Sequence, residues 1–152
     1  MDKFEYRKTL AGRLDSLIDV GFATFRGFVR LVLGELEFVS GRLQPFVQIR
    51  PKEVRRLVFV CLGNINRSAF ADVVATGLGA HTASFGLSTN TGEPAFEKAV
   101  STAPVYGYDL AAHRATNFPD YTFQPGDLLL AMEVRHVREL VRRGIPEDSI
   151  AL

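Results

Sequence analysis

Cys61, Arg67 and Ser68 are the residues of this 152-residue chain whose types and spacing could do chemistry. Cys61 is the single cysteine, and Arg67 and Ser68 follow it by six and seven positions. A cysteine thiolate is a strong nucleophile, and an arginine can hold two oxygens of a phosphoryl group with its planar fork of N–H donors. The Ser68 hydroxyl could donate a hydrogen bond to the thiolate. These residue types indicate nucleophilic attack on a phosphate-like oxyanion.

The flanking sequence predicts a strand before Cys61 and a helix from Arg67. Residues 57–60 are a continuous run of apolar β-formers, as in a strand buried on both faces of a parallel sheet. After Arg67 the apolar residues recur at helical spacing. Residues 62–66 then form a loop at a helix N-terminus, where backbone N–H groups and a partial positive charge bind a dianion. The same field favours the thiolate form of Cys61.

A cysteine followed at this distance by an arginine also arises by chance, and a buried cysteine at a strand end is often a structural thiol. The surrounding sequence favours the reactive interpretation. Gly63 and Asn64 can take unusual backbone angles inside the loop, and the strand and helix patterns lie on either side of it.

The loop Val60-Cys61-Leu62-Gly63-Asn64-Ile65-Asn66-Arg67-Ser68 resembles the active-site loop of the low-molecular-weight protein tyrosine phosphatases. Other segments resemble the same family in the same order. They are Ser84–Ser88, Gly92–Pro94, Gly107–Leu110, His113–Ala115 and Asp127–Glu133. The resemblance therefore covers roughly Arg56 to the end of the sequence.

The resemblance implies an α/β fold, a flavodoxin-like three-layer sandwich with a parallel sheet of three to four strands. It implies hydrolysis of phosphotyrosine or aryl phosphate through a cysteinyl-phosphate intermediate, with no metal or other cofactor. Cys61, Arg67 and Ser68 would be the catalytic residues, and Ser88 and Asn90 would brace the phosphate loop from a second layer. The phosphate-binding residues would be Leu62, Gly63, Asn64, Ile65, Asn66 and Arg67.

The sequence departs from the family pattern after the region expected to form the fourth strand. The family protonates the departing phenolate with an aspartate in an Asp-Pro-Tyr-like loop, which precedes a last helix, and residues 54–152 contain neither. Asp120 follows a proline but lies before the third expected strand, so the role is not transferred to it. Because general acid catalysis contributes roughly 10²–10⁴-fold, we expect this length of chain to bind oxyanions but to hydrolyse phosphotyrosine slowly.

Residues 1–53 are expected to form a helical extension and linker, and residues 54–152 the phosphatase-like domain. Apolar residues recur at intervals of three or four between Leu10 and Val39, but Asp19, Arg26 and Arg30 make a membrane-spanning helix unfavourable. Three roles stay open for residues 10–39. They can pack on the phosphatase-like domain, bind a partner or second copy, or lie on a membrane surface.

The overall composition narrows the partners and the compartment. A net charge of +1 argues against nucleic-acid binding, and a lone cysteine excludes an internal disulfide. A reactive thiolate needs a reducing compartment, and the charged N-terminus is unlike a secretory signal, so we expect a cytoplasmic protein. The expected partner is a phosphotyrosine protein or a small aryl phosphate. The alternative is a non-catalytic module that binds phosphate or phosphopeptides.

Overall fold

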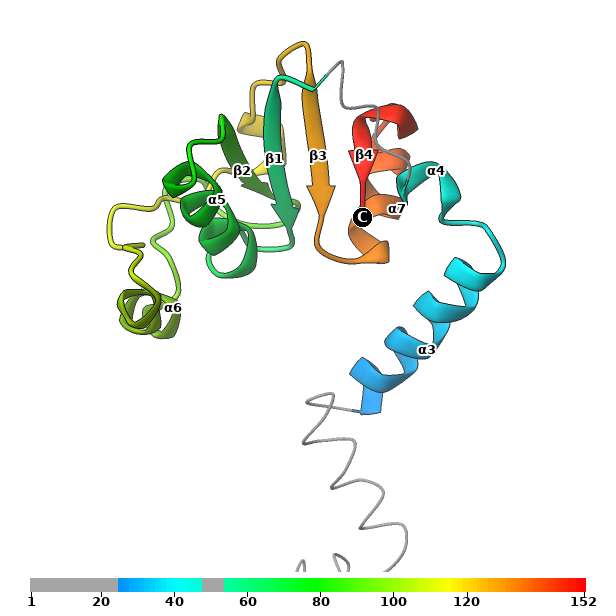
Figure 1. Cartoon of the computed structure of the whole chain (residues 1–152), viewed down its shortest axis with the longest axis horizontal. Helices are drawn as coiled ribbons and strands as arrows, with labels where there is room; N and C mark the ends of the chain where they lie inside the picture. The colour runs from blue at the N-terminus through cyan, green and yellow to red at the C-terminus, as the bar shows by residue number, and fades with distance from the viewer. Residues whose placement is uncertain (1–24, 48–53) are drawn as a thin grey trace, which may run out of the picture. The chain divides into compact units, whose positions relative to one another are not determined.

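The computed structural model describes residues 25–47 and 54–152, which fall into a unit ending at Gln44 and a second unit, Pro45–Leu152. The boundary predicted between residues 53 and 54 lies at the edge of a segment, 48–53, that is outside the described residues. All the described strands lie in the second unit (Figure 1).

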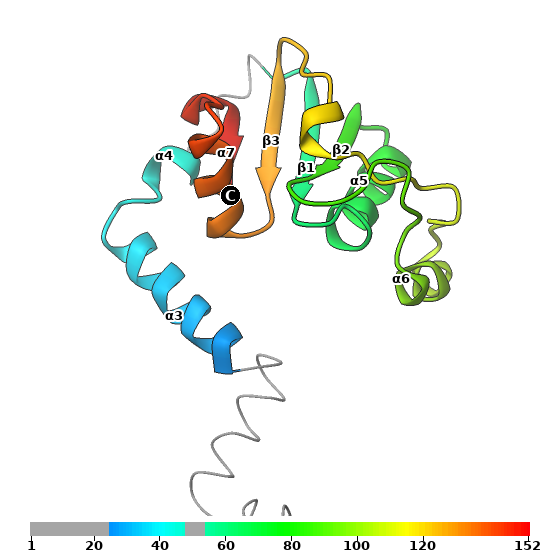
Figure 2. The same cartoon turned by 180° about the vertical axis from the view of Figure 1, so that it is seen from behind.

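The second unit is built on a four-stranded parallel sheet with the strand order β2-β1-β3-β4. The strands are β1 (Arg56–Cys61), β2 (Thr82–Gly86), β3 (Asp127–Ala131) and β4 (Ile150–Ala151). Helix α5 (Arg67–Gly77) covers one face and α7 (Val134–Arg142) the other, as Figures 1 and 2 show. The predicted α/β fold with a parallel sheet of three to four strands is thereby confirmed.

The apolar run of β1 explains why this strand lies inside the sheet. Val58 and Val60 are fully buried, and their register partners in β3 are Leu129 and Ala131. Because β1 pairs with β2 on one side and β3 on the other, its backbone hydrogen bonds are satisfied on both edges. Cys61, the last residue of β1, therefore has a fixed position.

Helix α6 (Glu97–Thr102), which continues into the 3-10 helix η2 (Ala103–Tyr106), packs against α5. Two further 3-10 helices, η3 (Phe118–Asp120) and η4 (Glu147–Ser149), precede β3 and β4. A core of Ala69, Ala95, Ala103 and Leu110 joins α5 to α6 and η2. The small alanines allow a close approach between these helices, which brings α6 next to the start of α5.

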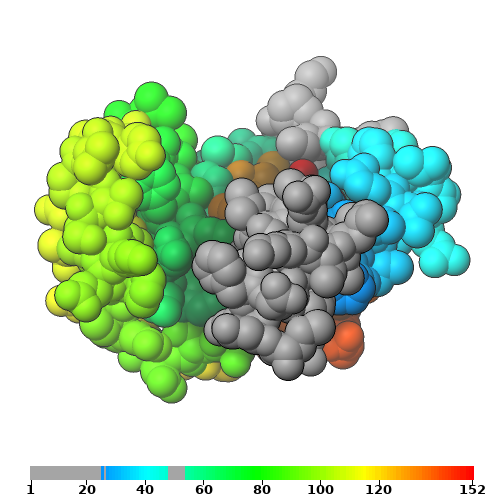
Figure 3. Space-filling model, turned by 90° about the horizontal axis from the view of Figure 1, so that it is seen from below, coloured from blue at the N-terminus to red at the C-terminus, as the bar shows by residue number. Residues whose placement is uncertain are grey.

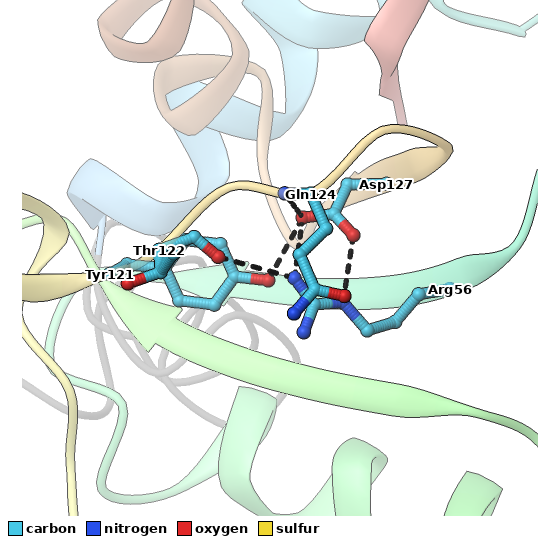
Figure 4. A network of polar contacts seen from close by, with 5 residues as sticks. All are labelled: Arg56, Tyr121, Thr122, Gln124 and Asp127. Atoms are coloured by element: carbon cyan, nitrogen blue, oxygen red, sulfur yellow. Dashed lines mark hydrogen bonds and ion pairs between the residues drawn. The ribbon is translucent and has the colours of Figure 1, made fainter.

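A buried polar cluster joins β1 and β3 at the end of the sheet where both strands begin (Figure 4). Arg56 donates to both carboxylate oxygens of Asp127 at 2.7 Å, and Tyr121 and the backbone N–H of Gln124 also donate to Asp127. Burial and the neighbouring Asp127 raise the pKa of Tyr121, which keeps its hydroxyl protonated as a donor. Since Arg56 and Asp127 are register partners, this cluster sets the register of the two central strands.

The first unit contains α3 (Phe25–Val39), and the short helix α4 (Gln44–Val47) follows it. Eight large apolar residues of α3 are exposed, and five of them lie at alternating intervals of four and three along the helix. These five are Phe25, Val29, Val32, Leu36 and Val39, and the other three are Leu31, Leu33 and Phe38. Within residues 25–47 and 54–152, no helix combines the length and hydropathy needed to cross a membrane.

We predict that Asp127→Asn lowers the free energy of unfolding by about 3 kcal/mol, because it leaves the nearly buried Arg56 guanidinium without its counter-charge. Burial by itself would raise the pKa of the Asp127 carboxyl, but hydrogen bonds from Arg56 and Gln124 hold this pKa below its usual value. The stabilisation by its charged form is therefore present at neutral pH and is lost as the pH falls below about 4. Urea unfolding at pH 7 and pH 3 measures both effects.

The exposed Asp148→Asn is the matched control, and we expect it to change the stability at pH 7 by less than about 0.5 kcal/mol. Equal effects of the two substitutions at pH 7 would show that the Arg56 cluster does not hold the strands.

Candidate active site

The Cys61 side chain lies at the carboxyl end of β1, below the loop of residues 62–66. It is 4% exposed, and its Sγ is 2.9 Å from the Ser68 Oγ. The backbone N–H of Asn64 donates to the same sulfur at 3.2 Å. Two hydrogen-bonding groups therefore converge on the sulfur, at the N-terminal end of α5, where the helix dipole also favours a negative charge.

Asn64 occupies the centre of the loop and is completely buried. Its φ of 50° lies in the left-handed region, which asparagine tolerates better than most residues with a Cβ. Its side-chain N–H donates to Ser68 Oγ at 3.0 Å, and its side-chain oxygen accepts from the backbone N–H of Thr116 at 2.9 Å. One side chain thus joins the loop, α5 and a distant segment of the chain.

The direction of the hydrogen bonds follows from the groups involved. Because the Asn64 amide nitrogen can only donate, Ser68 Oγ accepts that bond and its own hydrogen is available to Cys61. The Asn64 carbonyl oxygen can only accept, so His113 Nε2, at 2.7 Å, carries a hydrogen. The Ser68 hydroxyl therefore stabilises a negative charge on the sulfur.

Backbone hydrogen bonds hold the loop against its neighbours. Cys61 O accepts from the N–H of Leu87, Leu62 O from that of Ser88, and Ile65 O from that of Phe96, at 3.0, 2.8 and 2.7 Å. A Cβ on Gly86 would lie 2.9 Å from Leu62 O, so the close approach of β2 to the loop requires glycine there.

Ser88 and Asn90, predicted to brace the loop, lie in the turn after β2, and both residues are exposed. Ser88 contacts the loop through its backbone N–H. Asn90 uses its carbonyl to accept from the N–H of Glu93, inside its own turn. Of the predicted site residues, the structure brings Cys61, Asn64 and Ser68 into direct contact, with Leu62, Gly63, Ile65, Asn66 and Arg67 around them.

Arg67 starts α5, and its guanidinium pairs with Glu133, which lies between β3 and α7. Its Nη1 donates to Glu133 Oε1 at 2.5 Å, and the Arg67 side chain is 47% exposed. Arg135 pairs with the same carboxylate at 2.6 Å. Partial burial by itself would raise the pKa of Glu133, but hydrogen bonds from Arg135 and Arg67 hold this pKa below its usual value. The Glu133 carboxylate is therefore ionised near neutral pH.

Glu133, His113 and Thr116 were not predicted as site residues. Each lies at least 49 positions from the loop or helix residue that it contacts, so local spacing gives no sign of the contact. The signal that could have found Glu133 and His113 is their position inside the segments that resemble the phosphatase family. Thr116 acts through its backbone N–H, which no residue type reveals.

His136, on α7, is a further buried group near Glu133 that sequence reasoning did not single out. Burial lowers its pKa to about 4, with Glu133 opposing and Arg135 and Arg67 adding to the effect. Its imidazole is therefore neutral near pH 7 and adds no charge beside Arg67. Among the described residues, no three His, Cys, Asp or Glu side chains group as a metal site would require.

Comparisons with known proteins agree with this geometry. A family model described as low molecular weight phosphotyrosine protein phosphatase matches residues 56–150. The Erwinia amylovora tyrosine phosphatase AmsI is 26% identical over 70% of this chain and 72% of its own, with a TM-score of 0.57. A low molecular weight protein tyrosine phosphatase from T. tengcongensis is 32% identical over 64% of this chain and 71% of its own, with a TM-score of 0.55.

The tyrosine phosphatase Wzb from Escherichia coli K30, solved with sulphate, is 27% identical over 65% of this chain and 71% of its own, with a TM-score of 0.55. No curated protein sequence matches the chain. The family model covers the sheet, the loop after β1 and α7, which include all the residues of the candidate site. The chain therefore belongs to the low molecular weight phosphotyrosine protein phosphatase family.

Proposed function

We propose that the chain hydrolyses phosphotyrosine or aryl phosphates with Cys61 as the nucleophile. The observation that carries this proposal is the position of the Cys61 sulfur, 2.9 Å from Ser68 Oγ and 3.2 Å from the Asn64 N–H at the start of α5. Both contacts favour the thiolate. The Wzb protein, solved with sulphate and with phosphate, supports an oxyanion as the ligand of this fold.

The reaction proceeds in two displacements at phosphorus. The Cys61 thiolate attacks the phosphorus, and the bond to the phenolic oxygen breaks, so that the phenolate leaves with the electron pair. Water then attacks the same phosphorus, the P–S bond breaks, and the sulfur recovers its electron pair as inorganic phosphate departs. The loop N–H groups of residues 62–67 and the Arg67 guanidinium hold the other phosphoryl oxygens through both steps.

Two side chains have supporting roles in this scheme. Ser68 donates its hydrogen bond to the sulfur as the P–S bond breaks and so makes the thiolate a better leaving group. Glu133 engages Nη1 of Arg67, which leaves the Nε–Nη2 edge of the guanidinium for two phosphoryl oxygens. The two displacements at phosphorus use no metal ion or other cofactor. A reducing compartment such as the cytoplasm would keep Cys61 reduced.

The second candidate function is a module that binds phosphate or a phosphopeptide without turnover. The favouring observation is that Glu133, the carboxylate in contact with Arg67, is ionised and cannot donate a proton to a leaving group. Binding needs only the loop and the arginine, whereas hydrolysis of a poor leaving group also needs an acid. Turnover separates the two functions.

We predict that Cys61→Ser lowers the hydrolysis of p-nitrophenyl phosphate by roughly 10³-fold or more, because it removes the nucleophile. Affinity for inorganic phosphate, measured by calorimetry, should change by less than about threefold, since the loop amides and Arg67 remain. Ser101→Ala, an exposed substitution on α6, is the control. A wild-type chain that binds phosphate but does not turn over this activated substrate would identify the binding module instead.

A second prediction concerns the leaving group. Because no protonated carboxyl contacts the loop among the described residues, kcat/KM should be about 10²-fold or more higher for p-nitrophenyl phosphate than for phenyl phosphate. Glu133→Gln should weaken phosphate binding without changing this ratio. Equal kcat/KM values for the two substrates, or a ratio that rises in Glu133→Gln, would show that an acid in this chain assists the leaving group.

We further propose that residues 10–39 bind a helical partner, which a second copy of the chain can supply. The exposed stripe of α3, with apolar residues at alternating intervals of four and three, is the pattern of a coiled-coil seam. Sedimentation should show a dimer that Val32→Glu, within the stripe, dissociates and that the neighbouring Leu31→Glu, outside it, leaves intact. A monomer that instead binds lipid vesicles would overturn the second copy in favour of a membrane surface.

A further inference from the structure

We propose that an apolar pocket beside the phosphate loop binds a large apolar side chain of a protein substrate, next to its phosphorylated residue, and that Lys98 favours an acidic residue nearby. The inference rests on the proposed phosphatase function and names the substrate sequence that the site prefers. The pocket, called the side pocket below, has a volume of about 540 Å³. Its walls include Arg67, Phe70, Phe96, Lys98, Tyr106 and Met132.

The side pocket is continuous with the phosphate loop without lying over the sulfur. Asn66 and Arg67 belong to both, whereas Cys61 and residues 62–65 do not line the pocket. The Phe96 N–H donates to Ile65 O at 2.7 Å, so the loop and the pocket wall are tied together. Helix α5 and the α6–η2 segment lie side by side on the face that Figure 3 shows. A phosphoryl group bound in the loop would therefore not occupy the side pocket, which stays open to another part of the substrate.

The walls of the side pocket suit an apolar occupant. Phe70 and Tyr106 meet edge to face with their ring centroids 6.2 Å apart. Phe96 is 49% exposed and Tyr106 is 67% exposed, which leaves large aromatic surfaces in contact with water. Covering such surfaces with a leucine or aromatic side chain removes apolar area from water, and the volume is within the usual range of ligand pockets, about 300–1,000 Å³.

The charges at the side pocket have one sign. Arg67 and Lys98 are the charged residues of its lining, and Arg67 is already paired with Glu133. Lys98 lies on α6 and is exposed. A carboxylate on the substrate would therefore be attracted to this rim, whereas a lysine would be repelled. The combined preference is an apolar residue and an acidic residue flanking the phosphotyrosine.

The test uses phosphotyrosine peptides that differ only in the flanking pair. Leu-Glu, Ala-Glu or Leu-Lys is placed on both sides of the phosphotyrosine, and binding to the full chain carrying Cys61→Ser is measured by fluorescence anisotropy. We expect the Leu-Glu peptide to bind about tenfold more tightly than Ala-Glu and about threefold more tightly than Leu-Lys.

Three substitutions in the pocket lining and two controls outside it, all made in the same chain, assign these preferences to the side pocket. Thr102→Trp fills the pocket and should abolish the preference for leucine over alanine, whereas Ser101→Trp, on the adjacent exposed residue outside the lining, should retain it. Tyr106→Ala opens the wall and should also reduce the preference for leucine. Lys98→Glu should reverse the preference between glutamate and lysine, whereas the control Arg142→Glu, on α7, should not.

Inorganic phosphate binding separates failure of this inference from failure of the proposed function. If the chain binds phosphate and all three peptides with equal affinity, the side pocket is not a substrate site and the inference is overturned. If Thr102→Trp and Ser101→Trp reduce the preference for leucine equally, this preference arises outside the side pocket, and the inference is again overturned. If neither phosphate nor any peptide binds, the proposed function and the inference both fail.

Discussion

The buried side chain of Asn64 is the constraint on which the site depends. It is enclosed at the bottom of the loop and must satisfy both ends of its amide there, because an unpaired buried amide costs free energy. One end meets Ser68, which touches the nucleophile, and the other meets the backbone at Thr116. The left-handed backbone of Asn64 at the same time turns its own N–H toward the sulfur. A single residue therefore fixes the loop path, the orientation of Ser68 and one hydrogen bond to the Cys61 sulfur.

Parallel pairing explains why the partners of the loop come from distant parts of the chain. In a parallel sheet all the strands end at one edge, so the segments after β1, β2 and β3 meet there. The loop follows β1, the bracing turn with Ser88 follows β2, and Glu133 follows β3. The Arg56–Asp127 cluster secures the opposite edge, where these strands begin, and thereby maintains the alignment of the ends that form the site.

The sequence predicted the parts of this structure that local patterns determine. The apolar run before Cys61 indicated a central strand, and helical spacing after Arg67 indicated α5, because both depend on neighbouring residues. The fold and family could also be predicted from matching segments. Glu133 as the partner of Arg67, and the contacts of Asn64 with His113 and Thr116, could not, because spacing along the chain does not reveal which distant residues meet.

The contact between His113 and Asn64 makes the loop geometry independent of the charge on that histidine. The carbonyl of Asn64 needs a hydrogen on Nε2, and both the neutral Nε2–H tautomer and the imidazolium have one. A proton that binds to Nδ1 therefore leaves this bond in place. The shape of the anion cradle is therefore the same for either charge state of His113, while the electric field around the sulfur differs between them.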